Sequence, residues 1–245
     1  MLQACLNGSR SRDFHPNTPL TPAELSADAA AVLAAGATEL HLHPRDEAGA
    51  ETLDPVHVAA ALEAIRARVP GTPIGLSTHA GIAPGGAGRL EAVKAWTVLP
   101  DYVSVNLIEE DAPEIIALAL SRGIGVEAGL WSEADAERFV KLPEARQALR
   151  ILIEINEQDA AEGLEVAAAI RKVLARASLD VPVLQHGLDA TMWPLYHDAL
   201  LRELDSRIGL EDGKLLPNGS IAADNAALIK AAMLMARMPP DVRTA

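Results

Sequence analysis

Short apolar segments alternate with longer, alanine-rich segments along the whole chain, and this alternation constrains the fold more than any other feature. Strand-length apolar runs separated by helical segments are typical of parallel β-strands joined by helical crossovers. Eight such units follow one another without a break in composition, and they most simply close into a barrel. The sequence therefore predicts an α/β fold, a single (β/α)8 TIM barrel over residues 1–245. The predicted strands are 2–6, a segment that carries His41 and His43, 74–77, 102–105, 125–128, 150–155, 183–186 and 207–210.

The predicted helices begin at recognisable caps. Thr21-Pro22-Ala23-Glu24 is a capping box, and Gly36 is the expected end of the helix that it opens. Further helices are predicted at 55–68, at 89–96, after Ser132 and at 222–236. An open, doubly wound sheet is the alternative fold. It is disfavoured because no GxGxxG or phosphate-loop signature follows any strand, and the glycine-rich segment 85–88 lacks the lysine of a phosphate loop.

Composition narrows the class of protein. The net charge of −13 argues against nucleic acid or an anionic membrane surface as partner, although a local basic pocket for an anionic substrate stays compatible with it. No apolar stretch reaches the roughly 18 residues that a transmembrane helix requires. Cys5 is the only cysteine and lies in an apolar run, which predicts a core residue and no disulfide framework. We therefore expect a cytoplasmic protein.

Two histidines alternate with leucines in the segment Leu40-His41-Leu42-His43. On a strand, this spacing sends both imidazoles to one face, where they supply half of a first-row metal site. Pro44 cannot donate a ladder hydrogen bond, so we expect the strand to end there with the histidines at its tip. The motif alone is weak, because two hydrogen-bonded core histidines would give the same pattern.

Many polar residues fall at the predicted C-terminal strand ends, where the active site of a barrel lies. So many charged groups at an apolar barrel mouth are difficult to explain by packing alone. Glu211 is the natural third ligand, because two histidines and one carboxylate leave an open position on a zinc ion. Asp212 follows directly and Arg207 lies nearby, so Asp212 is a candidate for an oriented, ionised base. In isolation, Glu211 and Asp212 would be interpreted as solvated carboxylates of a turn.

The chain resembles one family through nearly its whole length, the β-keto acid cleavage enzymes. The resemblance is carried by an HxHxRD element and an RxGxED element, in this order and at this separation. The matching segments are Thr21-Pro22-Ala23-Glu24, Ala35-Gly36-Ala37, His41-Leu42-His43-Pro44-Arg45-Asp46, Leu76-Ser77-Thr78, Asp101-Tyr102-Val103-Ser104-Val105-Asn106, Val126-Glu127-Ala128-Gly129 and Arg207-Ile208-Gly209-Leu210-Glu211-Asp212.

The resemblance implies a zinc-dependent barrel that acts on a β-keto acid and acetyl-CoA, releasing acetoacetate and a new acyl-CoA. It implies that His41, His43 and Glu211 bind the metal ion. Arg207 and Asp212 match the catalytic pair, with Asp212 removing a proton from C2, and Ser77 and Ser104 match hydroxyl positions that serve catalysis. It also implies a homo-oligomer, a tetramer. The predicted substrate contacts are Arg10, His79, Asn106 and Glu127.

Three residues depart from the family pattern, of which Gly213, after Glu211-Asp212, is a minor change. Arg10 stands where a glutamate faces the ammonium group of the best-known substrate, which predicts a preference for an anionic or polar β-keto acid. His79 stands where glycine is more frequent, and the roles of His15 and His186 stay open. Two other functions compete: a metal-dependent barrel lyase or aldolase that acts through an enolate without coenzyme A, and a non-catalytic metabolite-binding barrel.

Overall fold

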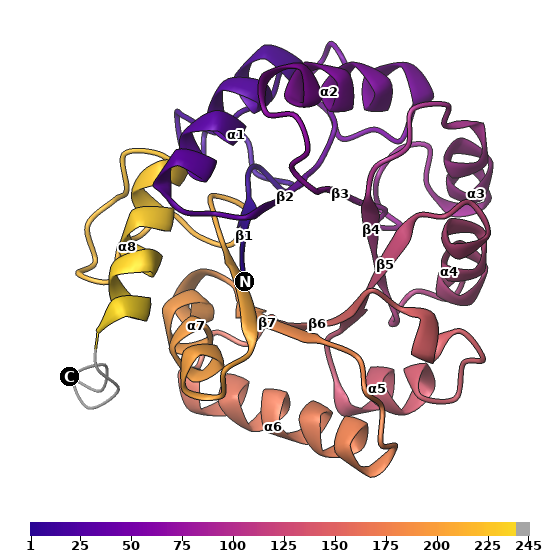
Figure 1. Ribbon diagram of the computed structural model, residues 1–245, viewed down its shortest axis with the longest axis vertical. Coiled ribbons are helices and arrows are strands. Elements are labelled where there is room, and N and C mark those ends of the chain that lie inside the picture. Colours follow the sequence, from indigo (N-terminus) through magenta and orange to yellow (C-terminus); the bar gives the residue numbers. More distant parts are fainter. Residues whose placement is uncertain (239–245) are drawn as a thin grey trace.

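The computed structural model describes residues 1–238, which form a closed barrel of eight parallel strands. Each strand pairs with the next along the chain, and the strands form a ring (Figure 1). The first strand pairs with the last, with Gln3 opposite Arg207, and this contact closes the ring. The predicted (β/α)8 barrel is confirmed. The strands are β1 (Leu2–Cys5), β2 (Glu39–Leu42), β3 (Ile74–Ser77), β4 (Tyr102–Asn106), β5 (Gly125–Leu130), β6 (Arg150–Ile155), β7 (Val183–Gly187) and β8 (Asp205–Ile208).

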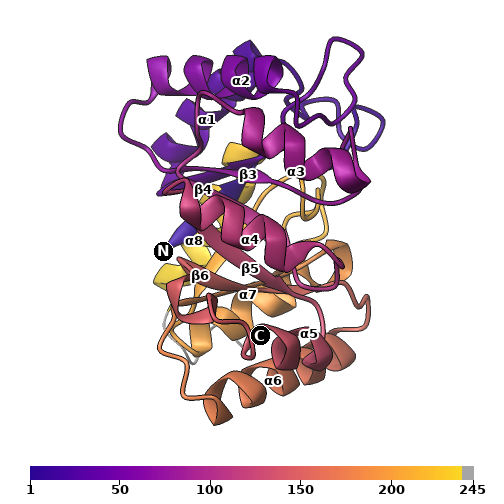
Figure 2. The ribbon, with the colours of Figure 1, turned by 90° about the vertical axis from the view of Figure 1, so that its right-hand side faces the viewer.

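Helices surround the barrel and cover its outer face (Figures 1 and 2). The α-helices are α1 (Pro22–Ala35), α2 (Pro55–Arg68), α3 (Gly86–Ala95), α4 (Ala112–Ser121), α5 (Glu133–Phe139), α6 (Ala160–Arg176), α7 (Met192–Leu201) and α8 (Asn225–Arg237). Two short 3-10 helices, η1 (Ala145–Gln147) and η2 (Asp189–Thr191), lie in the loops. None of the helices within residues 1–238 combines the length and the apolar character that crossing a bilayer requires.

The predicted boundaries of α1 are confirmed in detail. The Thr21 hydroxyl accepts a hydrogen bond from the backbone N–H of Glu24 at 3.2 Å, and the Glu24 carboxylate accepts one from Thr21 N–H at 3.0 Å. Gly36 ends the helix at φ 119°, and a side chain there would meet Met233 Cγ of α8 at 2.9 Å. Glycine therefore both ends α1 and lets α8 pack closely against it.

The apolar core lies between the strands and the helices, whereas the barrel interior is polar. Gln3 of β1 donates hydrogen bonds to Tyr102 of β4 at 2.9 Å and to Glu127 of β5 at 2.8 Å, so these side chains meet across the barrel. Arg150 of β6 lies 3.1 Å from the carboxylate of Glu127. These buried groups fill the N-terminal half of the barrel, in place of the apolar layers common in this fold.

Three strands, β1, β4 and β7, end one residue from their predicted ends, and two strands, β5 and β8, differ by two residues; the difference in β5 moves a predicted site residue. β5 continues to Leu130, two residues beyond the predicted end, so Glu127 lies inside the barrel and not at its mouth. β8 runs from Asp205 to Ile208, not from 207 to 210, because the chain leaves the sheet at Gly209. A side chain at Gly209 would overlap the carbonyl oxygen of Cys5, so glycine is required there.

Candidate metal centre and active site

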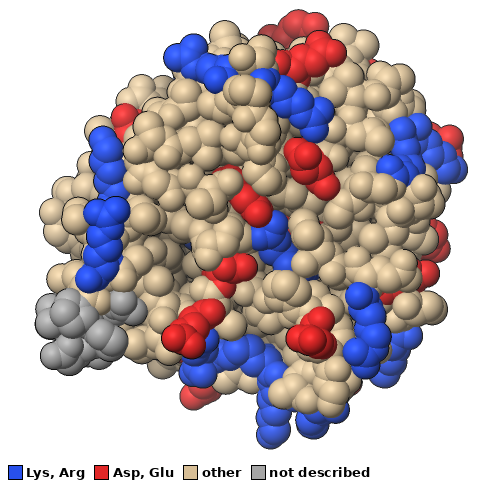
Figure 3. Space-filling model, in the orientation of Figure 1, with Lys and Arg blue, Asp and Glu red and all other residues tan. Residues whose placement is uncertain are grey.

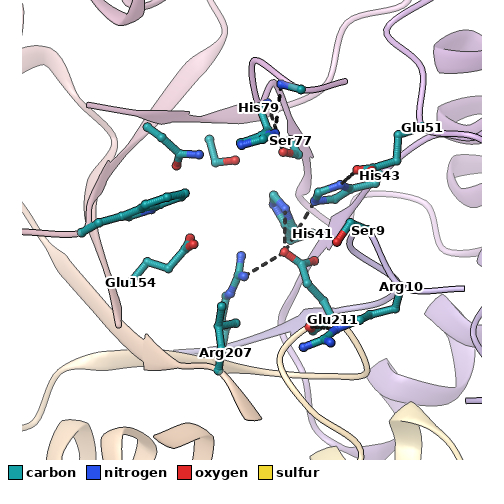
Figure 4. A pocket seen from close by; sticks show the side chains of 15 residues that line it. Ser9, Arg10, His41, His43, Glu51, Ser77, His79, Glu154, Arg207 and Glu211 are labelled. Carbon is teal, nitrogen blue, oxygen red and sulfur yellow. Dashed lines mark hydrogen bonds and ion pairs between the residues drawn. The ribbon is translucent and has the colours of Figure 1, made fainter. Parts of the chain in front are cut away.

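A cavity of about 300 Å³ opens at the C-terminal ends of the strands. The residues that line it come from strands and loops all around the barrel, and most of them are polar (Figure 4). The lining residues are Ser9, Arg10, His41, His43, Glu51, Ser77, His79, Gly81, Ser104, Asn106, Trp131, Glu154, Leu188, Arg207 and Glu211.

His41, His43 and Glu211 converge on one side of the cavity, with one ligand atom of each within 4.8 Å of the others. The Nε2 atoms of His41 and His43 lie 3.7 Å and 3.5 Å from the same carboxylate oxygen of Glu211. Two ligands bound tetrahedrally to one zinc ion stand about 3.4 Å apart, since each lies about 2.1 Å from the metal. The second oxygen, Glu211 Oε2, is buried without a hydrogen-bond partner among residues 1–238. The three side chains therefore fit a divalent metal ion.

Neighbouring groups hold His43 in place from two directions. Its Nδ1 contacts the carboxylate of Glu51, which leaves Nε2 directed at the cavity. Asn7 accepts a hydrogen bond from the backbone N–H of His43 and donates one to its carbonyl oxygen, both at 2.9 Å. A carboxylate on the far nitrogen is typical of metal-binding histidines, because it fixes the ring orientation and the tautomer.

The charges around the triad favour a cation. Burial lowers the pKa of His41 to about 3, so this imidazole is neutral and its Nε2 is free to bind a metal ion. Burial also opposes a charge on His43, but Glu211 and Glu51 outweigh it and raise the pKa of His43 to about 9. Burial disfavours ionised Glu211 as well, yet Arg207 and the two histidines hold the pKa of this carboxyl well below its usual range. The field that retains a proton on His43 also attracts a divalent ion.

Arg207 links the metal triad to Asp212. Its Nη2 atom donates to Glu211 at 2.8 Å and to Asp212 Oδ1 at 2.9 Å. Asp212 is fully buried and does not line the cavity, and Cys5 Sγ donates to its other oxygen at 2.9 Å. Burial would raise the pKa of Asp212, but Arg207 and His186 lower it overall, so the carboxylate is ionised. Burial raises the pKa of Cys5 well above its usual value, so Cys5 is a core thiol as predicted.

The structure brings most of the other predicted site residues together. Ser77, His79, Ser104 and Asn106 line the cavity on the β3 and β4 side, and Arg10 lines it from the loop after β1. Glu127 is the exception. The prediction placed it at the cavity, but it lies in the barrel interior, bound to Gln3 and paired with Arg150.

Arg10 lines the cavity but is already engaged by protein groups. Its Nη2 atom forms an ion pair with Asp189 at 2.8 Å, and its Nε atom donates to the carbonyl oxygen of Glu211 at 3.2 Å. The guanidinium also stands over the ring of Phe14, 4.2 Å from the ring centroid. The sequence predicted a cation that needs a substrate carboxylate, whereas Asp189 supplies a carboxylate from within the protein.

Two of the remaining histidines, His15 and His186, are buried and contact other protein groups. His15 is buried, and its Nε2 lies 2.9 Å from the carbonyl oxygen of Ala222, away from the cavity. His186 is buried between two carboxylates, 3.4 Å from Asp212 and 3.6 Å from Glu154. His186 therefore lies between Asp212 and a residue of the cavity wall.

Sequence reasoning missed several cavity residues, above all Glu154. Its signal was present: in the β6 segment Ile153-Glu154-Ile155, one carboxylate interrupts an apolar strand close to its C-terminal end. Glu51, by contrast, lies in the loop after β2, and nothing in its local sequence indicates a contact with His43. Ser9, Trp131 and Leu188 also lie in loops and lacked a signal.

Comparison with known protein families shows to which family the chain belongs. The family model of the beta-keto acid cleavage enzymes matches residues 1–184. The chain belongs to this family. The match contains the two histidines of β2 and ends before Arg207, Glu211 and Asp212, so the structure adds the second half of the site independently. A comparison with curated protein sequences gives no match.

Solved structures share the fold at low sequence identity. The apo structure of ObcA aligns with a TM-score of 0.73 and 16% identity, covering 89% of this chain and 61% of that one. The ternary complex of ObcA with a C4-CoA adduct and oxalate gives 0.74 and 16%, covering 89% and 63%. The chain thus spans less than two thirds of the length of ObcA. An N-acetylmannosamine-6-phosphate 2-epimerase from Clostridium perfringens aligns at 0.58 and 12%, covering 86% and 87%. At these identities the likeness shows the barrel alone.

Proposed function

We propose that the protein transfers the acyl part of a β-keto acid to coenzyme A, using acetyl-CoA as second substrate. The bond between C2 and C3 of the keto acid is broken, C2 joins the acetyl group to give acetoacetate, and the released thiolate takes the remaining acyl group. No atom or electron is left over, so no redox partner is needed. The observation that carries the proposal is the convergence of His41, His43 and Glu211 beside Arg207 and Asp212, in a chain of this family.

In this proposal His41, His43 and Glu211 hold Zn²⁺, because their donor set and spacing suit that ion. When bound, the metal ion would withdraw electrons from the oxygens of the keto acid and make its C2 proton more acidic. The protein supports this with fixed ligands: Glu51 and Asn7 orient His43, and Arg207 orients Glu211.

Arg207 and Asp212 carry the proton transfer. Arg207 lines the cavity and touches Asp212, and its Nη1 atom makes no hydrogen bond within residues 1–238. Asp212 is buried behind Arg207, so in this proposal a substrate carboxylate that binds the guanidinium displaces Asp212 Oδ1 from it, and the freed carboxylate turns toward the cavity to accept the C2 proton. Asp212 is ionised at neutral pH, as a general base must be, and losing its contact with Arg207 when substrate binds would raise its pKa and strengthen it as a base.

The β3 and β4 side of the cavity completes the proposed site. The Ser77 hydroxyl accepts a hydrogen bond from the backbone N–H of His79 at 3.3 Å, which holds it at the cavity wall. Ser104 and Asn106 line the cavity with side chains that make no hydrogen bond within residues 1–238, so both can donate to substrate oxygens. Acetyl-CoA as second substrate and a homotetrameric assembly complete the proposal, and light scattering tests the assembly.

The decisive experiment incubates the zinc-loaded protein with a panel of β-keto acids and acetyl-CoA. Mass spectrometry of the coenzyme A fraction should reveal one new acyl-CoA whose acyl group matches the added keto acid, together with an equal amount of acetoacetate. The Asp212→Asn variant is the matched control, because it keeps the metal ligands and removes the base.

Two results would contradict the proposal. Cleavage at an equal rate without acetyl-CoA would identify a lyase that acts without coenzyme A. Absence of turnover across the panel, in protein that binds zinc tightly, would favour a metabolite-binding barrel.

A further inference from the structure

The segment Glu211-Asp212 carries a metal ligand and the proposed base, yet it lies outside the sheet. β8 ends at Ile208, so strand pairing does not fix the two residues. Two loops hold their backbone instead. Arg10, in the loop after β1, donates from Nε to the carbonyl oxygen of Glu211 at 3.2 Å. Asp189, in the loop after β7, donates its backbone N–H to the carbonyl oxygen of Asp212 at 2.6 Å.

The two holding residues are also bound to each other. Arg10 Nη2 and Asp189 Oδ2 form an ion pair at 2.8 Å, which closes a ring of contacts around the segment. β1 and β7 flank β8 in the barrel, so the ring connects all three strand ends. The Arg10 and Asp189 side chains are 26% and 45% exposed, so water reaches the pair but Phe14 covers one face of the guanidinium.

The backbone of the β1 loop lies directly against the Glu211 side chain. Gly8 has φ 51°, and a side chain there would overlap the Glu211 Cγ atom. Arg45 holds this loop by donating to the carbonyl oxygens of Gly8 and Arg10. The loop therefore limits the Glu211 side chain through Gly8 and its backbone through Arg10.

We infer that Arg10 and Asp189 are positioning residues that clamp the Glu211-Asp212 segment, so that the metal triad is assembled before a metal ion arrives. Arg10 thereby serves the metal site, and its charge is balanced within the protein. The inference rests on the proposed metal site and extends it, and it concerns no substrate. Outer groups that orient metal ligands typically contribute 10- to 100-fold to metal affinity.

The test compares four variants: Arg10→Gln, Asp189→Asn, the double variant and Arg12→Gln. Asparagine is close to isosteric with aspartate and tolerates the left-handed backbone of Asp189, at φ 47°. Arg12 is the matched control, because it is a more exposed arginine of the same loop and pairs with Glu24 instead. Zn²⁺ affinity is measured by competition with a chelator, and the visible spectrum of the Co²⁺-loaded protein reports ligand geometry.

Arg10→Gln should weaken Zn²⁺ binding by about 10- to 100-fold and change the Co²⁺ spectrum. Asp189→Asn should weaken it less, since its backbone N–H still reaches Asp212. The double variant should lose no more than Arg10→Gln alone, because the Asp189 carboxylate acts through Arg10. Arg12→Gln should match the wild type in both measurements.

Wild-type Zn²⁺ affinity and an unchanged Co²⁺ spectrum in Arg10→Gln would overturn the inference. Fully additive losses in the double variant would also overturn it, since they would make the two residues independent. A wild-type protein that binds Zn²⁺ but transfers no acyl group would contradict the proposed function alone and leave the clamp intact.

Discussion

The two walls of the cavity differ in how completely their polar groups are engaged. On the wall formed by β1, β2 and β8, the side chains of His43, Arg207 and Glu211 each have protein partners, and Glu211 Oε2 is the one buried carboxylate oxygen there without a partner in residues 1–238. On the opposite wall, formed by β4 to β6, the Ser104 and Asn106 side chains make no hydrogen bond within residues 1–238. Figure 4 shows Glu154 on the side of the cavity away from Glu51 and His43.

The difference indicates that the two walls have different roles. The engaged wall is organised before substrate arrives, as the proposed metal site and base require. The open wall offers hydrogen-bonding groups that a substrate can satisfy, so it is the part that distinguishes one keto acid from another. Trp131 belongs to this open wall, because its indole N–H is buried without an acceptor within the described residues.

Removing a metal ligand should break the engaged wall and have the largest effect. We expect His41→Ala to lose stoichiometric zinc and to lower turnover by about 10³-fold or more, since metal ions contribute several kcal/mol to such steps. Elemental analysis and a turnover assay measure both effects. His57→Ala on α2, outside the cavity, is the control. Equal zinc content in His41→Ala and wild type would show that the triad is not the site.

Removing the proposed base should leave the metal in place. We expect Asp212→Asn to bind zinc normally and to lose roughly 10²- to 10⁴-fold in turnover, the usual contribution of a positioned general base. Deuterium exchange at C2 of the keto acid, followed by NMR without acetyl-CoA, reports the proton transfer directly. Near-normal exchange in the variant would assign the base to another residue.

Changing the open wall should alter selectivity more than rate. Glu154 lines the cavity, and its nearest charged partner is His186 Nε2 at 3.6 Å, too far for a hydrogen bond. We expect the wild type to favour a β-keto acid that carries an ammonium group over one that carries a second carboxylate, which reverses the preference predicted from Arg10. Glu154→Gln should shrink the ratio of the two kcat/KM values by about 10- to 100-fold, the range for one charge-assisted hydrogen bond.

Arg10→Gln is the comparison variant for this experiment, since Asp189 already pairs with that arginine. If Arg10→Gln changes the ratio and Glu154→Gln does not, Arg10 is the selector after all.

We expect the smallest effect on turnover from substitutions in the hydrogen-bond network that lies behind the engaged wall. Asn225 donates to Leu6 O and to Asp28, and accepts from Leu210 N–H, so it connects the ends of β1 and β8 to α1. Burial raises the pKa of Asp28 to about 7, against the hydrogen bond from Asn225. The folded state therefore retains a proton that the unfolded chain loses near pH 4, and the stability that this proton provides falls as pH rises to about 7.

Asp28→Asn should remove that dependence. Relative to the variant, the wild-type free energy of unfolding should fall by up to about 1.4 kcal/mol per pH unit between pH 4 and pH 7, and then level off. Urea unfolding at several pH values measures the difference, with exposed Asp13→Asn as control. A constant difference between wild type and variant over this range would contradict the raised pKa.

The sequence predicted the barrel and the shared face of His41 and His43 because both depend on local order, and barrel closure then brings Glu211 to the two histidines. Alternating segments determine the strand count, and the spacing of His41 and His43 determines a shared face. The position of Glu127 was wrong, since the glycine in Ala128-Gly129-Leu130 hid the true end of β5. The partner of Arg10 could not be predicted, because Asp189 lies in a loop distant in the sequence and only barrel closure brings the two residues together. Figure 3 shows why charge alone is a weak guide: acidic and basic side chains are mixed over this face.

Because β8 closes the ring by pairing with β1, the site is completed late during synthesis of the chain. His41 and His43 leave the ribosome early, whereas Glu211 belongs to the last part of the chain. Two histidines on an unclosed sheet lack the third ligand, and the β1 loop lacks the segment that it holds. A nascent chain therefore completes the proposed metal site, base and clamp in one late event, when the final strand enters the barrel.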